Sequence, residues 1–297
     1  DSGSHARRQT VKRWKDSRGS NYVIPTRRPR ILDGAAGEGF RQGYNKRGTV
    51  HHRVVPAEVD GLPVKILTSK TLEASVERRP ISGGAAVFPE LELDCAKEGT
   101  RFLATAVRCE DLEAKILDHV EHLPQCHFVV WPELTIDDAS LSVIIEAFRQ
   151  RSLKGEIVPA MVLAGSWHRP DEQGRMRNRA PILDGAGRRF GWFSKFARFA
   201  DKEVGYEAVE SGEEFVVVVT EDCIAAVCIC KDFSDLQNNP WAHLPVDVVL
   251  VASMGEAKTM DGHLVRAADL SKGHGRRTFV VQQGLWNFDK EPANFLL

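Results

Sequence analysis

The chain has 297 residues, which is enough for one large domain or for a medium domain with an extension. Hydrophobic residues make up 42% and charged residues 27%, the profile of a soluble globular protein. No apolar run approaches the roughly 20 residues that span a bilayer, and the N-terminus lacks the apolar core of a signal peptide. The sequence therefore gives no indication of membrane insertion or export, and we expect no membrane partner.

Cysteine usage indicates the compartment. The six cysteines lie at positions 95, 109, 126, 223, 228 and 230, without a CxxC motif and without the spacing of a small secreted disulfide framework. This pattern favours reduced thiols and a cytoplasmic location. It also leaves a thiol free to act as a nucleophile.

The net charge of −1 hides an uneven distribution. Residues 1–53 carry 13 Lys and Arg against 4 Asp and Glu, a balance of +9, so the remainder carries −10. A basic arm of this kind can contact nucleic acid or an acidic partner. It can equally be a solvated segment, the interpretation that we favour because no recognisable nucleic-acid-binding motif accompanies it.

In chain order, residues 1–98 are predicted to form a basic, irregular extension. Up to residue 50 the segment is rich in Arg, Gly and Ser, and its short apolar stretches between 50 and 95 are separated by Gly and Pro. We therefore place the start of the folded domain at residue 99.

From residue 101 strands and helices alternate. A buried strand at 101–107, a helix at 110–123 ended by Pro124, and a strand at 127–131 come first. A helix capped by Asp137 or Asp138 and a strand at 157–165 follow. This alternation predicts right-handed crossovers and a mainly parallel sheet covered by helices.

The remainder is also α/β. A hairpin is predicted around Asp-Gly-Ala-Gly at 184–187. Strands are expected at 215–220, 224–230, 247–252 and 278–282, with a helix over 262–276. The domain thus spans about 200 residues of the α/β class.

Three strand ends carry reactive side chains. Glu133 follows the strand at 127–131, Lys195 ends the predicted hairpin, and Cys230 ends the apolar run IAAVCIC. Ligands of open α/β sheets gather at the carboxyl ends of strands, so these groups can converge there.

The same residues carry a family resemblance. VVWPEL at 129–134, the run from Asn178 to Lys195, and CICKDFSDL at 228–236 occur in the order seen in the nitrilase, or carbon–nitrogen hydrolase, superfamily. That family has a "PE" after a strand, a "K" after a hairpin and a "C-x-D" after another strand. Residues 100–290 resemble it, each motif being weak alone and specific in combination.

The resemblance implies a four-layer αββα sandwich of two sheets, each covered by helices on its outer face. It implies hydrolysis of a non-peptide C–N bond in a small amide or nitrile substrate, without a cofactor or metal. It also implies homo-oligomers that pair through the outer helices. Family members place further strands after a segment similar to VVVQQGLWN, which corresponds to residues 279–287 here. We therefore expect either a domain that lacks its final strands or a longer polypeptide.

The family's roles transfer to Cys230 as nucleophile, Glu133 as general base and Lys195 as stabiliser of the oxyanion. A thiol attacks only as thiolate and needs a base, and the attack on a carbonyl creates an oxyanion that a fixed positive charge stabilises. We expect the backbone N–H of Lys231 to be a second oxyanion donor and Asp232 to hold the turn after the nucleophile.

A fourth residue is expected from the family, a second glutamate after the lysine. Glu207, five residues before Gly212, is the better match, and Glu203 is the alternative. Glu90 in VFPEL is a decoy for Glu133 because no strand–helix unit precedes it. Cys223 and Cys228 are expected to be inert core thiols.

Competing functions are also open. Lys231 stands where the family commonly has an aromatic residue and nitrilases have Cys-Trp-Glu, which favours amides over nitriles. A non-catalytic module of a larger protein, mediating dimerisation or partner binding, is the main alternative. The string RILDGAAGEGF with Glu58 or Asp60 is similar to a nucleotide-binding loop of methyltransferases, although a Gly-rich turn explains it. A zinc enzyme is disfavoured, since neither HExxH nor paired CxxC occurs.

Overall fold

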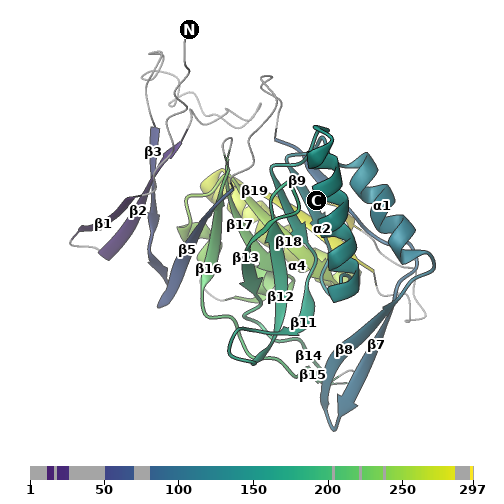
Figure 1. Cartoon of the computed structure of the whole chain (residues 1–297). Helices are drawn as coiled ribbons and strands as arrows, with labels where there is room; N and C mark the ends of the chain where they lie inside the picture. Colours follow the sequence, from purple (N-terminus) through teal and green to yellow (C-terminus); the bar gives the residue numbers. More distant parts are fainter. Residues whose placement is uncertain are drawn as a thin grey trace.

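The structure is a computed structural model that describes residues 12–16, 19–26, 51–69, 81–202, 205–220, 223–236, 239–284 and 295–296. Two large sheets stack face to face, and helices cover the outer face of each (Figure 1). These layers form the four-layer αββα sandwich that the sequence predicts.

The first large sheet has six strands. Strands β10, β9 and the edge strand β6 are parallel, and β12 joins β10 in the antiparallel sense and forms hairpins with β11 and β13. The strands are β6 (Gly83–Ala85), β9 (Phe128–Trp131), β10 (Met161–Ala164), β11 (Trp167–Pro170), β12 (Met176–Leu183) and β13 (Arg189–Ser194).

Two helices cover this sheet, α1 (Leu112–His122) and α2 (Asp138–Leu153). Helix α1 buries Ile116 and Val120, one turn apart on one face. Helix α2 begins at an Asp137 cap, whose Oδ1 accepts from the Ser140 N–H at 2.8 Å. Apolar side chains of both helices pack with the outer face of the sheet in one buried cluster.

The second large sheet has seven strands in the order β20-β19-β18-β17-β16-β5-β4, and its central strands are buried on both faces. Runs of Val and Ile suit strands that are covered on both sides. The strands are β4 (Glu58–Val59), β5 (Leu62–Thr68), β16 (Phe215–Val219), β17 (Ile224–Ile229), β18 (Val248–Met254), β19 (Arg277–Gln283) and β20 (Phe295–Leu296).

The helices of this half are α3 (Lys231–Asp235), a 3-10 turn η2 (Pro240–His243) and α4 (Ala257–His274). Helix α4 contacts β19 and buries Met260, His263 and Leu270. It ends at Gly275, whose φ of 62° is a left-handed cap that glycine adopts without steric cost.

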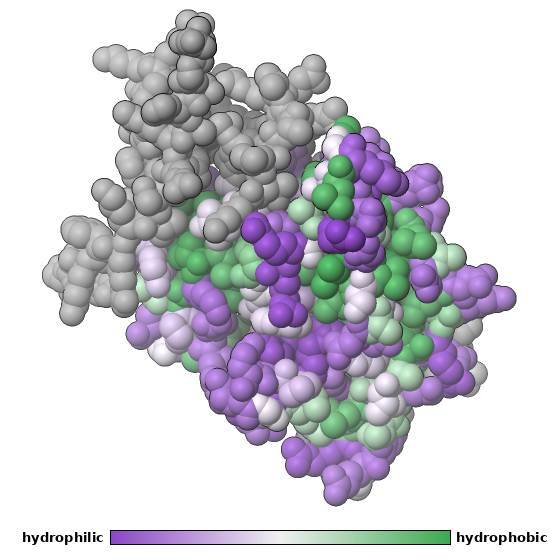
Figure 2. Space-filling model, viewed as in Figure 1, coloured by the Kyte–Doolittle hydropathy of each residue, from purple (hydrophilic) through white to green (hydrophobic). Residues whose placement is uncertain are grey.

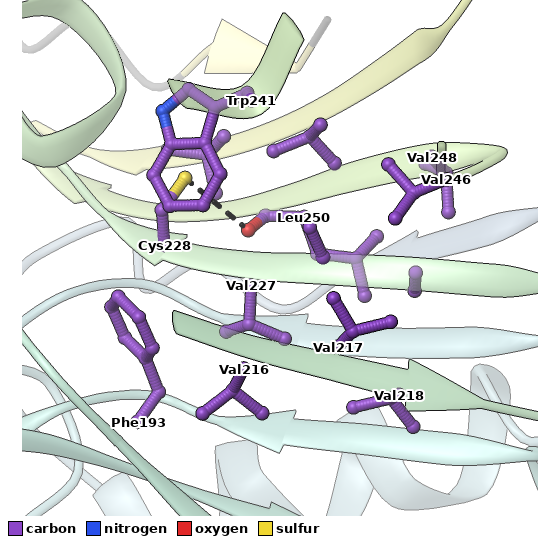
Figure 3. Packing of buried hydrophobic residues seen from close by; sticks show 14 of the residues in the cluster. Phe193, Val216, Val217, Val218, Val227, Cys228, Trp241, Val246, Val248 and Leu250 are labelled. Carbon is purple, nitrogen blue, oxygen red and sulfur yellow. Dashed lines mark hydrogen bonds between the residues drawn. The ribbon is translucent and has the colours of Figure 1, made fainter. Parts of the chain in front are cut away.

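The main core lies between the two sheets, where Phe193 of β13 meets the valines of β16 and β17 (Figure 3). Cys228 lies in this core beside Trp241, and its thiol donates to the Leu250 carbonyl oxygen at 3.7 Å. Burial raises the pKa of Cys228 well above its usual value. The expectation that Cys228 is a core thiol fits this environment, as it does for buried Cys223.

Two smaller sheets flank the sandwich. Strands β1 (Lys12–Asp16), β2 (Gly19–Thr26) and β3 (His51–Pro56) form one, which Arg53 links to Asp247 by an ion pair of 2.5 Å. Strands β7 (Glu92–Glu98), β8 (Arg101–Arg108), β14 (Ala200–Asp201) and β15 (Gly205–Glu207) form the other.

The predicted irregular extension over 1–98 is corrected by these strands. Strand β5 pairs in parallel with β16 inside the second sheet, and β6 pairs in parallel with β9 inside the first. Strand β6 escapes detection because its residues are glycine and alanine: a Cβ placed on Gly83 would lie 2.5 Å from Phe279 Cζ. The Phe279 ring fills this space, so a larger side chain on Gly83 would displace it. The motif RILDGAAGEGF at 30–40 lies outside the described residues.

A second correction concerns 101–107, which we expected to be a buried strand of the main sheet. It is β8, which forms a hairpin with β7 and alternates between buried and exposed residues. Phe102 and Ala104 face inward, whereas Arg101 and Thr105 are exposed. The strand that pairs in parallel with β9 on this side is β6.

Hydrophilic residues cover much of the described surface in the view of Figure 2, with hydrophobic patches between them. Leu117 of α1 and Leu153 of α2 are among the exposed apolar side chains. Within the described residues, no helix is long and apolar enough to cross a membrane. Pairing through the outer helices stays a prediction.

Candidate active site

The three predicted residues meet where their strands end. Glu133 follows β9, Lys195 follows β13 and Cys230 follows β17. All three are at most 3% exposed. The Lys195 ammonium donates to Glu133 Oε1 at 2.6 Å. Both charges affect the pKa of the Cys230 thiol, so the three groups form one electrostatic unit.

Glu207 is the fourth member of this cluster. Its Oε2 accepts from Lys195 Nζ at 2.9 Å and from the Phe199 N–H at 2.6 Å. It is 1% exposed and lies on β15, which pairs with β8. The alternative, Glu203, lies outside the described residues. Glu90, the decoy for Glu133, is exposed and lies outside the cluster.

Sequence reasoning missed two polar residues that hold the carboxylates. Asn178 Nδ2 donates to Glu133 Oε1 at 3.0 Å and to Glu207 Oε1 at 2.8 Å. His168 Nε2 lies 3.0 Å from the same Glu207 oxygen. Because His168 Nδ1 accepts from the Ala104 N–H at 2.8 Å, the proton of a neutral imidazole is on Nε2 and is donated to Glu207.

The hairpin register explains why Asn178 was missed. Asn178 lies within the resemblance, but its role depends on which residue faces it across the β12–β13 hairpin. The register shifts at Ile182 and Leu183, and the shift places Asn178 opposite Lys195, whose N–H donates to the Asn178 carbonyl at 2.9 Å. Counting from the turn without this bulge pairs Asn178 with Ser194 and puts its side chain on the wrong face.

The buried ammonium is held by two carboxylates. Burial alone would lower the pKa of Lys195, but the charges of Glu133 and Glu207 raise it well above its usual value. Burial would likewise raise the pKa of Glu207, but Lys195 and the His168 hydrogen bond outweigh burial and lower it. With a neutral His168, the two glutamates and one lysine carry a net charge of −1.

Cys230 occupies an unusual backbone conformation. Its φ of 44° and ψ of −111° are disfavoured for a residue with a side chain, at a cost of about 1–3 kcal/mol. The conformation bends the chain sharply from β17 into α3 and presents the thiol at the edge of the sheet. The Cys230 N–H donates to the Ala252 carbonyl at 2.9 Å, and the thiol to the Met254 carbonyl at 3.5 Å.

The thiol is protonated at rest. Burial, followed by the Glu133 charge, raises the pKa of Cys230 to about 12, while Lys195 and hydrogen bonds with Ser253 and the Met254 backbone oppose this rise. Attack by Cys230 on an electrophile therefore requires a proton acceptor. The described hydrogen bonds to Glu133 all go to Oε1, which leaves Oε2 to accept that proton.

Asp232 ties the nucleophile turn to the lysine loop. Its Oδ1 accepts from the N–H groups of Phe196 and Ala197 at 2.9 and 2.7 Å, and its Oδ2 from Ile229 at 3.4 Å. Burial raises the pKa of this carboxyl to about 8, against the lowering effect of these donors and of Lys195. Asp232 thus fixes the segment after Lys195 against the end of β17.

Lys231 is the first residue of α3, so its backbone N–H has no acceptor within the helix. Its ammonium lies 3.7 Å from Asp235 Oδ2 and 5.3 Å from the centre of the Phe199 ring. The side chain therefore turns toward α3 and Phe199, and the N–H follows the nucleophile directly.

Comparisons with known proteins were made on sequence and on structure. No protein-family model matches the chain, and no curated protein matches it. Solved structures that match include a glutamine-dependent NAD+ synthetase from Acinetobacter baumannii, with 18% identity, 59% of this chain and 36% of that chain covered, and a TM-score of 0.43. This chain thus spans about a third of that synthetase.

Amidases match at similar values. A cysteine-to-alanine mutant of an amidase from the nitrilase superfamily of Nesterenkonia AN1 matches with 15% identity over 58% of this chain and 68% of that one, at a TM-score of 0.42. An amidase from Nesterenkonia sp. matches with 15% identity over 58% and 67%, also at 0.42.

Proposed function

We propose that the protein is a hydrolase of non-peptide C–N bonds that works through a thioester on Cys230. The observation that carries the proposal is the buried cluster in which one ammonium joins two carboxylates beside a strained cysteine. Burying such charges costs several kcal/mol of desolvation free energy, which their pairing only partly repays. Clusters of buried ionisable groups of this kind are typical of catalytic sites.

In the first half-reaction the Cys230 sulfur attacks the carbonyl carbon of an amide. The thiol proton passes to Glu133 Oε2, and negative charge develops on the carbonyl oxygen. The Lys195 ammonium and the Lys231 N–H stabilise this oxyanion. Glu133 returns the proton to the departing nitrogen, the C–N bond breaks, and ammonia or an amine leaves.

In the second half-reaction water resolves the thioester. Glu133 removes a proton from the attacking water, the oxyanion forms again, and the C–S bond breaks to release a carboxylic acid and the thiol. Glu207 keeps Lys195 charged and in place, and Asn178 and His168 keep Glu207 in place. The net reaction consumes one water and cleaves one C–N bond.

We propose amides over nitriles. The residue after the nucleophile is Lys231, followed by Asp232, where nitrilases of the resembling family have Trp and Glu. The buried position of Asp232, bonded to the lysine loop, gives that residue a structural role in place of a second carboxylate at the substrate.

The test is a panel of small amides, read by ammonia release and by intact mass after an acid quench. We expect ammonia release and an acyl adduct on Cys230 in the wild type, and neither in Cys230→Ala. Cys228→Ala is the matched control, two residues away in the same strand, and should keep both signals. Amide hydrolysis that persists in Cys230→Ala would refute the mechanism.

If no amide in the panel is cleaved and no adduct forms, the alternative of a non-catalytic module gains support. The same panel extended to nitriles decides the preference. Acid formation from nitriles at a higher kcat/KM than from the matching amides would contradict the proposed amide preference.

A further inference from the structure

A buried serine and histidine lie next to the proposed nucleophile. Ser253 is at the end of β18 and His263 is on α4, and both are 0% exposed. Ser253 Oγ and His263 Nε2 are 2.9 Å apart. The mechanism above uses neither residue.

Ser253 is adjacent to Cys230 by backbone pairing. The Cys230 N–H donates to the carbonyl of Ala252, and its thiol donates to the carbonyl of Met254, so the cysteine spans the residues on either side of Ser253. Ile229 pairs with Ala252 in the parallel ladder of β17 and β18, which brings Ser253 next to Cys230, and the Ser253 side chain lowers the pKa of the thiol. A hydroxyl that favours a thiolate does so by donating to the sulfur.

The imidazole orients that hydroxyl. Among the described residues His263 Nδ1 has no hydrogen-bond partner. A buried N–H without an acceptor costs more than a nitrogen lone pair without a donor, so the proton lies on Nε2 and is donated to Ser253 Oγ. The Ser253 O–H must then point elsewhere, to the sulfur or to Gln282 Oε1 at the long distance of 3.4 Å.

Gln282 is itself held in place, because its Nε2 donates to the carbonyls of Gly255 and Glu256 at 3.1 and 3.0 Å. Because Gln282 is fixed at this long distance, its Oε1 is a weak acceptor for the Ser253 proton while the thiol is neutral. When Cys230 ionises, its sulfur becomes a stronger acceptor than Gln282 Oε1, because hydrogen bonds to ionised groups are about twice as strong as those between neutral groups.

We propose that His263 and Ser253 form a hydrogen-bond relay that stabilises the Cys230 thiolate, with Ser253 as the donor to sulfur and His263 as the positioning residue. The inference rests on the proposed function in one respect, that Cys230 is the nucleophile. No bond other than hydrogen bonds forms or breaks in the relay, and no proton leaves the imidazole.

The charges around the relay are consistent with a neutral imidazole. Burial lowers the pKa of His263 to about 4, and Asp235 of α3 opposes this only in part. The centre of the Phe233 ring of α3 lies 5.9 Å from that of the His263 ring. The other ionisable groups that interact electrostatically with the Cys230 sulfur are Glu133, Lys195 and Cys228. The relay thus works by orientation rather than by charge.

The experiment measures alkylation of Cys230 by iodoacetamide at pH 7 to 9, with peptide mapping to separate it from Cys95, Cys109 and Cys126. Below the pKa the rate follows the thiolate fraction. We expect Ser253→Ala to slow alkylation about tenfold at each pH, equivalent to one unit of thiol pKa. His263→Leu should slow it in the same direction, and His263→Gln, which keeps an N–H donor, should restore it.

A matched control is available in Thr220, whose hydroxyl lies 3.4 Å from the buried Cys223 thiol. Thr220→Val removes a buried hydroxyl beside a different cysteine and should leave Cys230 alkylation unchanged. Ser253→Ala alkylated at the wild-type rate overturns the relay, as does His263→Leu that melts lower but is alkylated normally. If His263→Leu does not fold, Ser253→Ala decides alone.

Alkylation needs no substrate, so this test is independent of turnover. A protein that cleaves no amide but shows the expected alkylation series would lose the proposed function and keep the relay. A protein that cleaves amides with an unchanged series would keep the function and lose the relay.

Discussion

Strand β12 contributes to two ion clusters, one on each of its faces. Asn178 points inward to the Glu133–Lys195–Glu207 cluster, while Arg177 points outward to Asp171 and Glu213. The shortest contacts are the same, 2.6 Å for Lys195–Glu133 and 2.6 Å for Arg175–Glu213. The inner pair is 2% and 4% exposed, whereas the outer pair is 39% and 63% exposed.

The distance between two charged groups therefore does not by itself show how much an ion pair contributes to stability. At the exposed Arg175–Glu213 pair of the outer cluster water competes for the charges, so this pair adds little to stability, whereas Arg177 and Asp171 beside it are each 4% exposed. In the inner one water is excluded, each charge depends on its partner, and the excess of one negative charge is felt by the Cys230 thiol. The predictions below probe this contrast.

The largest effect is expected for Lys195→Met. Removing the ammonium leaves two buried carboxylates without a counter-charge, which should cost about 3–5 kcal/mol of unfolding free energy and abolish turnover. Urea denaturation measures the first and ammonia release the second. The control is Lys65→Met, which breaks the exposed 2.8 Å pair with Glu214 and should change stability by less than about 1 kcal/mol. Equal losses in the two variants would remove the contrast.

Asn178→Leu should cost less, about 1–3 kcal/mol, because it leaves an oxygen of each glutamate without one of its donors. Turnover should fall as well, since only Lys195 then bridges the two like-charged carboxylates. The check is urea denaturation together with kcat. Asn178→Asp, which adds a third negative charge, should be more damaging than Asn178→Leu, and the reverse order would contradict an electrostatic bridge.

Glu133→Gln separates the two effects of that carboxylate. As the general base it is needed for turnover, so activity should be lost. As a negative charge it raises the pKa of Cys230, so its removal should lower that pKa from about 12. A lower thiol pKa means more thiolate at pH 8, and alkylation of Cys230 should become faster, by about tenfold for each unit. Slower alkylation would instead mean that Glu133 already shares the thiol proton at rest.

The smallest effect is expected in the outer cluster. Arg175→Ala breaks contacts with Asp171 and Glu213 but leaves Arg177 to pair with both, so the loss should stay within about 1 kcal/mol. Thermal unfolding at low and high salt measures it. A loss comparable to that of Lys195→Met would show that the outer cluster is as protected from water as the inner one.

The sequence was sufficient where local signals are strong. Apolar runs predict β9, β16, β17, β18 and β19, and motifs at strand ends predict that Glu133, Lys195 and Cys230 meet. Glu207 was preferred over Glu203 from its spacing to a glycine, and it contacts Lys195. These features can be predicted from local sequence, because the end of a predicted strand also fixes the position of the residue that follows it.

Other parts depend on packing that no local pattern records. Strand β6 has almost no side chains, because Phe279 occupies the space beside Gly83. His168 and Asn178 face each other across β11 and β12, but their inward direction depends on the bulge at Ile182 and Leu183. The relay from His263 to Ser253 connects α4 to β18 over the packed face of the second sheet, which sequence spacing cannot reveal.

The pairing of β5 with β16 has a consequence for how the chain folds during synthesis. Partners such as Val64 and Phe215 are separated by roughly 150 positions, so β5 cannot pair with β16 until Phe215 has left the ribosome. Until then the apolar segment at 62–67 has no β16 strand to pair with. We expect the nascent chain to depend on a chaperone over that interval, and its folding to begin with the local hairpins of the first sheet.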